Sequence, residues 1–195
     1  MSTTEHGSDL FRSAKDWQLN ACVNFGHDDW DVYAEGYRRA GEILIARLAA
    51  TNGESIDFLV YPLVFLFRHA LELHLKSAIR WGRLVLNRPS RGYPLGHKLI
   101  EFWSDCRALA EEYWPDDPTD LLDDIERTLR EFEKHDPDGQ AFRYSVDTGG
   151  TRTKPRLTHI NLRVFYEQAI KAYNLLDGMS TAFENAWQEW CEHQA

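Results

Sequence analysis

Apolar residues recur every three or four positions along the last part of the chain, and no other pattern restricts its fold as strongly. The series is Phe165, Ala169, Ala172, Leu176, Met179, Phe183, Ala186 and Trp190. Steps that alternate between four and three residues place successive side chains on one face of an α-helix, as in a heptad seam. The spacing predicts a long helix over residues 158–192, whose apolar face packs in the interior or pairs with a second copy.

Similar spacing predicts further helices, so the sequence indicates an all-α bundle of about five helices in a single domain over residues 1–195. The expected ranges are 28–50, 55–82, 97–114 and 119–134, with a short additional helix at 13–25. Residues 1–12 are polar and are expected to form a flexible tail. Residues 135–158 lack helical periodicity, which predicts a long irregular loop before the last helix, with a short extended piece at FRYSV.

The central stretch YPLVFLFRHALELHLK, residues 61–76, changes abruptly from apolar to charged. On a helix, Arg68, Glu72 and Lys76 share one stripe, while the opposite stripe is wholly apolar. Charges are costly to bury without partners. This helix is therefore expected to lie at the centre of the bundle, with its ionic part facing a cleft or a partner.

The ionic stripe has two interpretations. Cleaving RNA without a metal requires a base for the ribose 2′-hydroxyl, an acid for the leaving oxygen and a cation for the developing phosphorane charge. Glu72, His97 and Arg68 are candidates for these three roles, with His69 or Lys76 in support. The alternative is a ladder of ion pairs at i, i+4 spacing, worth about 0.3–0.5 kcal/mol per pair.

The sequence RHALELHLKSAI, followed by GHKLIEFW some twenty residues later, resembles the central helical hairpin of the HEPN superfamily. This superfamily comprises helical bundle domains of bacterial toxins, phage-defence proteins and nucleotidyltransferase partners. The resemblance covers residues 55–110 best. The order Arg68, three residues, Glu72, then a downstream His97 is similar to the active-site pattern of phage-restricting tRNA anticodon nucleases. The resemblance thus implies these three residues as the catalytic set.

The commoner HEPN ribonuclease pattern is an Arg followed by four to six residues and a His at the start of the last helix. Arg152 and His159 have this spacing, but Pro155 lies between them in a loop. FRYSVD, residues 142–147, also resembles a stretch found beside RHxxEL-type hairpins in bacterial proteins of this kind. The resemblance makes Arg143 and Tyr144 candidate phosphate ligands or structural partners of Glu72.

Composition limits the classes of function. The formal charge of −9 argues against broad, charge-driven nucleic-acid binding, although a local basic pocket is compatible with it. The three cysteines are odd in number and widely spaced, and two of them fall on apolar helix faces, which predicts buried thiols of a cytoplasmic protein. No run has the length of a membrane span. His69 and Glu72 have metal-ligand spacing but lack a second such pair, so neither a metal nor another cofactor is expected.

Two hypotheses follow. The first is a metal-independent endoribonuclease, directed at tRNA and set in a toxin or phage-defence system, with a homodimeric structure and an antitoxin or defence partner. Its catalytic residues are Arg68, Glu72 and His97, and its substrate-binding residues are His69, Lys76, Arg143, Tyr144, Arg152 and His159. The second is a non-catalytic module that binds a partner protein or a nucleotide and uses the ionic stripe to fix the hairpin.

Overall fold

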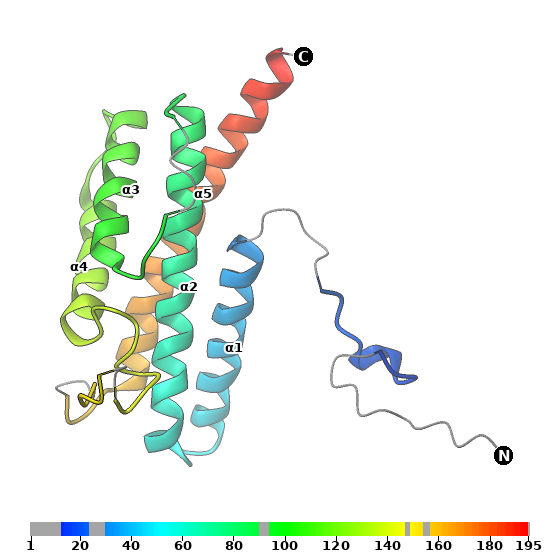
Figure 1. Ribbon diagram of the computed structural model, residues 1–195, viewed down its shortest axis with the longest axis vertical. Coiled ribbons are helices and arrows are strands. Elements are labelled where there is room, and N and C mark those ends of the chain that lie inside the picture. The colour runs from blue at the N-terminus through cyan, green and yellow to red at the C-terminus, as the bar shows by residue number, and fades with distance from the viewer. Residues whose placement is uncertain (1–12, 24–29, 90–93, 147–148, 154–156, 195) are drawn as a thin grey trace.

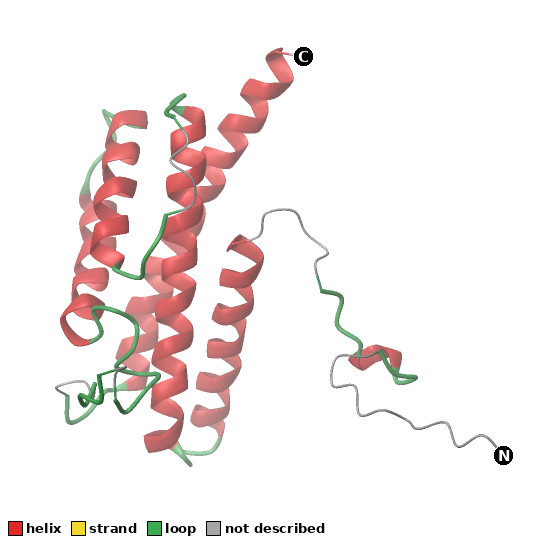
Figure 2. Cartoon of the chain, viewed as in Figure 1, coloured by secondary structure: helices red, strands yellow, loops and turns green. Residues whose placement is uncertain are grey.

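The computed structural model describes residues 13–23, 30–89, 94–146, 149–153 and 157–194. Within these residues the chain forms five α-helices and no strand, which confirms the predicted all-α bundle (Figure 2). The helices are α1 (Trp30–Ala50), α2 (Ile56–Val85), α3 (Leu99–Tyr113), α4 (Asp120–His135) and α5 (Leu162–Gln194). The predicted tail at 1–12 and the start of the first long helix at Asp28 or Asp29 lie outside the described residues.

Helix α2 lies at the centre of the bundle (Figure 1). It packs against α1, α3 and α5, and α4 completes the bundle against α3 and α5. The helix continues through Pro62, whose ring is exposed to solvent. Its buried face extends over most of its length because three neighbouring helices surround it, so Arg68, Glu72 and His74 are buried together with the apolar side chains.

The seam of α5 is mainly part of the interior. Its residues from Ala169 to Phe183 are buried, whereas Trp190 is exposed. Figure 1 shows the C-terminal end of α5 extending beyond the other helices. Most of the seam therefore packs within the chain, and the last turns of α5 extend beyond the bundle.

Several boundaries differ from the prediction. In the predicted helix at 13–25, only the short 3₁₀-helix Trp17–Leu19 forms among the described residues, because an isolated short segment lacks a packing partner. Helix α2 continues to Val85, three residues beyond its expected end at residue 82. The extended piece at FRYSV is reduced to an isolated bridge between Val146 and Arg152.

The cysteines also differ from expectation. Only Cys106 is buried, and burial raises the pKa of its thiol well above the ordinary value. Cys22 and Cys191 are exposed, because the first lies outside the bundle and the second lies on the overhanging end of α5. Among the described residues, no helix combines the length and the apolar character that crossing a bilayer requires.

Candidate functional site

Three segments that are far apart in the sequence meet beside the middle of α2. Arg68, Glu72 and Lys76 project from one face of this helix at i, i+4 spacing. His97 comes just before α3, and the turn that begins at Asp136 follows α4. The structure thus brings together the three residues that the sequence analysis named as the catalytic set.

The carboxylate of Glu72 is the centre of this cluster. One oxygen, Oε1, lies 2.9 Å from Lys76 Nζ and 2.9 Å from His97 Nδ1. The other oxygen, Oε2, lies 3.3 Å from Arg68 Nη1. The side chain is buried, so three cationic or polar partners replace the water that it loses.

These partners also keep Glu72 ionised. Burial alone would raise the pKa of its carboxyl group, but the hydrogen bonds and positive charges of Lys76 and His97 hold the pKa below its ordinary value of 4.5. An ionised carboxylate only accepts hydrogen bonds, so the proton in the contact with His97 belongs to Nδ1 of the imidazole. Glu72 therefore fixes the tautomer of this histidine and leaves Nε2 without its proton when the ring is neutral.

Arg68 joins the three segments from the inside. Its Nη2 donates to the backbone carbonyl of His97 at 2.8 Å, and its Nε donates to the carbonyl of Asp136 at 3.1 Å. Only 3% of its side chain is exposed. Arg68 thus holds the backbone of His97, while its ion-pair partner Glu72 holds the imidazole. The guanidinium faces protein carbonyls and carboxylates rather than an open surface, so it is placed to position groups.

His97 is the exposed member of the set. Its side chain is 61% exposed, although Nδ1 contacts the buried carboxylate. A buried carboxylate beside an exposed imidazole is typical of a carboxylate–histidine dyad. In such a dyad the histidine exchanges protons and the carboxylate orients the histidine. Such a dyad can act as a general base or acid on a molecule that approaches from solvent.

A second group of aromatic and basic side chains adjoins the dyad. His69 is partly buried, stacked on Phe65 at a centroid distance of 5.5 Å and edge-on to Tyr37 at 4.5 Å. The guanidinium of Arg143 lies 5.0 Å from the ring centres of Phe65 and Tyr144. Arg143 and Tyr144 are exposed, so the irregular segment presents a cation and a phenol at the surface beside α2.

Arg152 and His159 lie elsewhere. Arg152 is exposed and pairs with Val146 in the isolated bridge, and His159 is exposed at the rim of a cavity before α5. Within the described residues, no contact joins either side chain to Glu72 or His97. The spacing of the commoner ribonuclease pattern is thus present in the sequence, but its two residues do not join the dyad.

Sequence reasoning missed the turn after α4. Asp136 is buried, and its Oδ1 accepts a hydrogen bond from the backbone of Ala141 at 2.8 Å. Burial raises the pKa of Asp136, although that backbone donor and the charge of Arg68 oppose the shift. The only signal was the turn-forming composition of HDPDGQ, which indicates a change of direction but not its contact with α2.

Gly139 allows this turn to approach Arg68, and its replacement by alanine is expected to destabilise the protein. Its φ is +74°, and an added Cβ would lie 2.6 Å from Arg68 Nη1. We expect Gly139→Ala to lower the free energy of unfolding by about 2–3 kcal/mol, because the left-handed strain and the displacement of the guanidinium add. Chemical denaturation measures this change.

Gly150 provides the matched control for this substitution. Its φ is +80°, and no atom of the described residues lies within 4 Å of an added Cβ. Gly150→Ala therefore has the backbone strain alone, about 1 kcal/mol. Equal destabilisation by the two variants would show that the approach of Gly139 to Arg68 has no energetic consequence.

Acidification is expected to destabilise the protein through His69. Burial lowers the pKa of His69 below its ordinary value of 6.5. The unfolded chain therefore binds a proton more readily, and stability falls as the pH falls through the interval below 6.5. Replacing His69 with Phe should reduce the loss of unfolding free energy between about pH 7.5 and pH 5.

The control for His69→Phe is His193→Phe, at the exposed end of α5, which should leave this pH dependence unchanged. Glu72 does not interfere, because its lowered pKa confines its own loss of stabilisation to pH values below 4.5. A His69→Phe variant with the same pH dependence as the wild type would contradict the assignment.

Comparison with protein-family models, curated proteins and solved structures found no match to the chain. The HEPN superfamily therefore remains the prediction of a sequence resemblance. Among the described residues, no group of three or more His, Cys, Asp or Glu side chains is arranged to hold a metal ion.

Proposed function

We propose that the protein is a metal-independent endoribonuclease of the HEPN type. One observation carries the proposal: a buried, ionised carboxylate, Glu72, contacts Nδ1 of a histidine, His97, whose ring is otherwise exposed. Orienting an exposed imidazole in this way serves proton transfer with an external substrate. Basic and aromatic side chains beside the dyad suit a phosphate and a base.

The proposed reaction begins with His97. Its Nε2 takes the proton of a ribose 2′-hydroxyl, and the 2′-oxygen attacks the adjacent phosphorus. The bond from phosphorus to the 5′-oxygen breaks, that oxygen takes a proton from a solvent water, and the imidazolium of His97 returns its proton to the hydroxide left behind. The products are a 2′,3′-cyclic phosphate and a 5′-hydroxyl. Glu72 stabilises the imidazolium that forms on His97.

The exposure of each basic side chain decides which of them can contact the phosphate. The sequence hypothesis assigned the phosphorane charge to Arg68, but this side chain is buried among carbonyls and is better placed to position His97. The exposed guanidinium of Arg143 takes the role of phosphate ligand in the proposal, with Lys76 beside Glu72 as a second positive charge. Tyr144, on which Arg143 lies, is the adjacent surface for a base.

The biological setting follows the resemblance. We propose a tRNA substrate, a role in toxin or phage-defence systems and an antitoxin or defence partner. The net charge of −9 makes the overall surface repel nucleic acid. Recognition of a short RNA element by local cations such as Arg143 and Arg152 therefore suits the protein better than binding along a duplex.

A homodimer is part of this proposal. At the overhanging end of α5, the rings of Trp187 and Trp190 stack with a centroid distance of 4.9 Å, and Trp190 is 52% exposed. Exposed aromatic side chains on a projecting helix are typical of contact surfaces. We propose that a second copy covers this end of the helix.

The experiment that tests the function is cleavage of total tRNA and of single-stranded RNA by the wild-type protein in EDTA, with analysis of the new termini. The proposal expects 2′,3′-cyclic phosphate and 5′-hydroxyl ends. A parallel preparation of His97→Ala controls for contaminating nucleases. Absence of cleavage, or products with 3′-hydroxyl ends, would exclude this mechanism.

The second candidate is a non-catalytic module that binds a partner protein or a nucleotide. The observation in its favour is the complete burial of Arg68 and Glu72, since a buried ion pair can fix the register of neighbouring segments without any chemistry. In that case His97 is a structural partner of Glu72. A protein that binds RNA or a partner without cleavage would support this candidate.

A further inference from the structure

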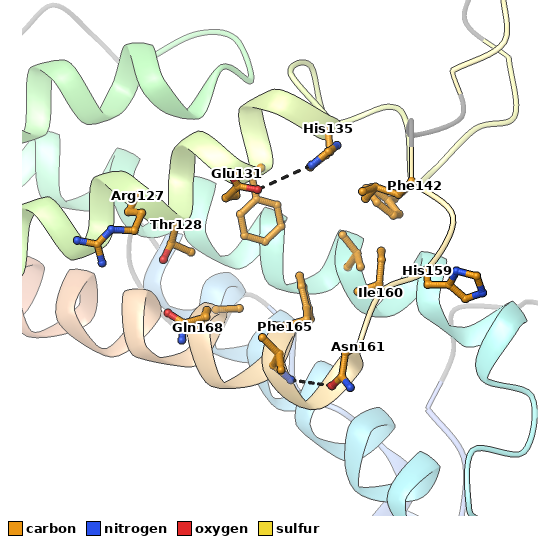
Figure 3. A pocket seen from close by; sticks show the side chains of 15 residues that line it. Arg127, Thr128, Glu131, His135, Phe142, His159, Ile160, Asn161, Phe165 and Gln168 are labelled. Atoms are coloured by element: carbon orange, nitrogen blue, oxygen red, sulfur yellow. Dashed lines mark hydrogen bonds and ion pairs between the residues drawn. The ribbon is translucent and has the colours of Figure 1, made fainter.

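A cavity of about 600 Å³ is lined in part by the segment that follows α4. Its walls are the C-terminal half of α4, the N-terminal turns of α5 and the residues just before α5, and Val64 of α2 contributes to its lining. Figure 3 shows Phe165 and Gln168 of α5 across the cavity from Thr128 and Glu131 of α4. This volume is within the range of small-molecule sites.

The lining is largely apolar and includes three aromatic rings. Phe132, Phe142 and Phe165 all line the cavity, and the rings of Phe132 and Phe165 meet edge to face with a centroid distance of 5.8 Å. Phe132 and Phe142 are mostly buried, so their positions are fixed by the bundle. Rigid aromatic walls favour a flat, unsaturated ligand, because ring faces and edges interact well with another ring.

The charges of the lining are compensated. Arg127 donates to Asp124 at 2.7 Å, and Glu131 lies 3.8 Å from both Lys134 and His135. Among the described lining residues, the one arginine is therefore paired with a carboxylate rather than available to a phosphate. The cavity favours an uncharged ligand over an anion.

Polar groups at the rim are available for hydrogen bonds. Within the described residues, the side chains of Gln168 and His159 have no hydrogen-bond partner, and both line the cavity. Asn161 uses its Oδ1 to accept from the backbone of Arg163 and Val164 at 3.1 Å each, which leaves its Nδ2 available. Carboxamides and imidazoles supply both donors and acceptors, as the edge of a nucleobase requires.

We propose that this cavity binds a nucleobase, either of a free nucleoside or of a nucleotide within an RNA chain. The ring lies among the phenylalanines, and Gln168 with the Nδ2 of Asn161 contacts its polar edge. The aromatic rings select a flat ligand, and the paired charges select an uncharged one. The amides of Gln168 and Asn161 select a ligand with both donors and acceptors.

The cavity and the dyad share one segment of the chain. Phe142 lines the cavity, and the guanidinium of the next residue, Arg143, lies over the ring of Phe65. Asp136, earlier in the same segment, is bonded to Arg68. The RNA form of this inference rests on the proposed function: a base in the cavity would place a neighbouring phosphate toward Arg143. The free-nucleoside form does not depend on it.

Two substitutions test the site without disturbing the core. Val164→Trp places a large side chain at the cavity from a position that is 47% exposed, and Gln168→Ala removes the carboxamide. The matched controls are Val32→Trp on α1, which is 41% exposed and away from this cavity, and Gln188→Ala near the other end of α5. Melting temperatures of all four variants verify that they fold.

Calorimetric titration of the wild type with adenosine, guanosine, cytidine and uridine gives the first readout. We expect saturable binding of at least one nucleoside. Val164→Trp should weaken it at least about 10-fold, and Gln168→Ala by about 2–10-fold, as loss of one hydrogen bond does. Both controls should bind like the wild type.

Cleavage kinetics give the second readout. An increase in KM with unchanged kcat in Val164→Trp, absent in Val32→Trp, would assign the site to a base of the RNA even if no free nucleoside binds. Nucleoside binding by a protein without ribonuclease activity would support the free-nucleoside form while the proposed function fails.

Two results would overturn the inference, and both require that no nucleoside binds at millimolar concentration. In the first, the protein cleaves RNA and Val164→Trp leaves KM unchanged. In the second, the protein does not cleave RNA. Decanoate serves as an apolar probe in the same titration. Saturable binding of decanoate, with neither nucleoside binding nor an effect on KM, would also overturn the inference and identify the cavity as a site for aliphatic chains.

Discussion

Replacement of Arg68 by alanine is expected to lower the free energy of unfolding by about 3–5 kcal/mol, the usual cost of leaving one member of a buried ion pair without its partner. The loss extends beyond Glu72. The carbonyls of Asp136 and His97 also lose their donor, and each lies in a different segment of the chain. Chemical denaturation at neutral pH measures the change.

The control for Arg68→Ala is Arg39→Ala on α1. Arg39 also pairs with a glutamate one turn away, but its side chain is 70% exposed, so its removal should cost about 0–1 kcal/mol. Equal costs for the two variants would contradict the view that Arg68 fixes the site. Combining Arg68→Ala with Glu72→Ala should cost less than the sum of the single changes, because the second substitution removes the charge that the first leaves unpaired.

The helices were predictable because each carries its own pattern. The alternating spacing from Phe165 to Phe183 is local information, and it specified both the existence of α5 and its buried face. The same holds for α2, where the i, i+4 spacing of Arg68 and Glu72 gave their shared stripe. The order of the elements and the hairpin of α2 with α3 then brought His97 near that stripe.

The environment of the site was not predictable in the same way. Whether Arg68 faces a substrate or the interior depends on the turn at Asp136, and this contact joins residues 68 positions apart in the sequence. No local pattern specifies such a contact. The positive φ of Gly139 permits it, but a glycine in a turn is common and does not indicate what the turn approaches.

The separation of roles within the catalytic set follows from this contact. Sequence reasoning placed Glu72, His97 and Arg68 all at the substrate, as base, acid and cation, since the three residue types are chemically suitable for these roles. Burial divides them: Arg68 and Glu72 are inside, and His97 is outside. Of these three residues, only His97 touches substrate in the proposed ribonuclease, and Arg68 and Glu72 are positioning residues.

His97→Ala is therefore expected to reduce kcat for RNA cleavage by about 10²–10⁴-fold, the range associated with loss of a general base. Its effect on stability should be small, because the imidazole is largely exposed and Glu72 keeps Arg68 and Lys76 as partners. Initial rates in EDTA and thermal melts of the same preparations measure the two effects. His193→Ala is the matched control, since His193 is exposed in the last turn of α5 and has no contact with the dyad within the described residues.

Glu72→Gln separates orientation from charge within the dyad. The carboxamide oxygen can still accept from His97 Nδ1, but it no longer stabilises an imidazolium. Because Glu72 is buried away from substrate, its effect should fall on kcat, with KM unchanged. Loss of rate in His97→Ala together with full activity in Glu72→Gln would show that the imidazole acts without its carboxylate. Full activity of both variants would remove the dyad from the mechanism and favour a structural role for the whole cluster.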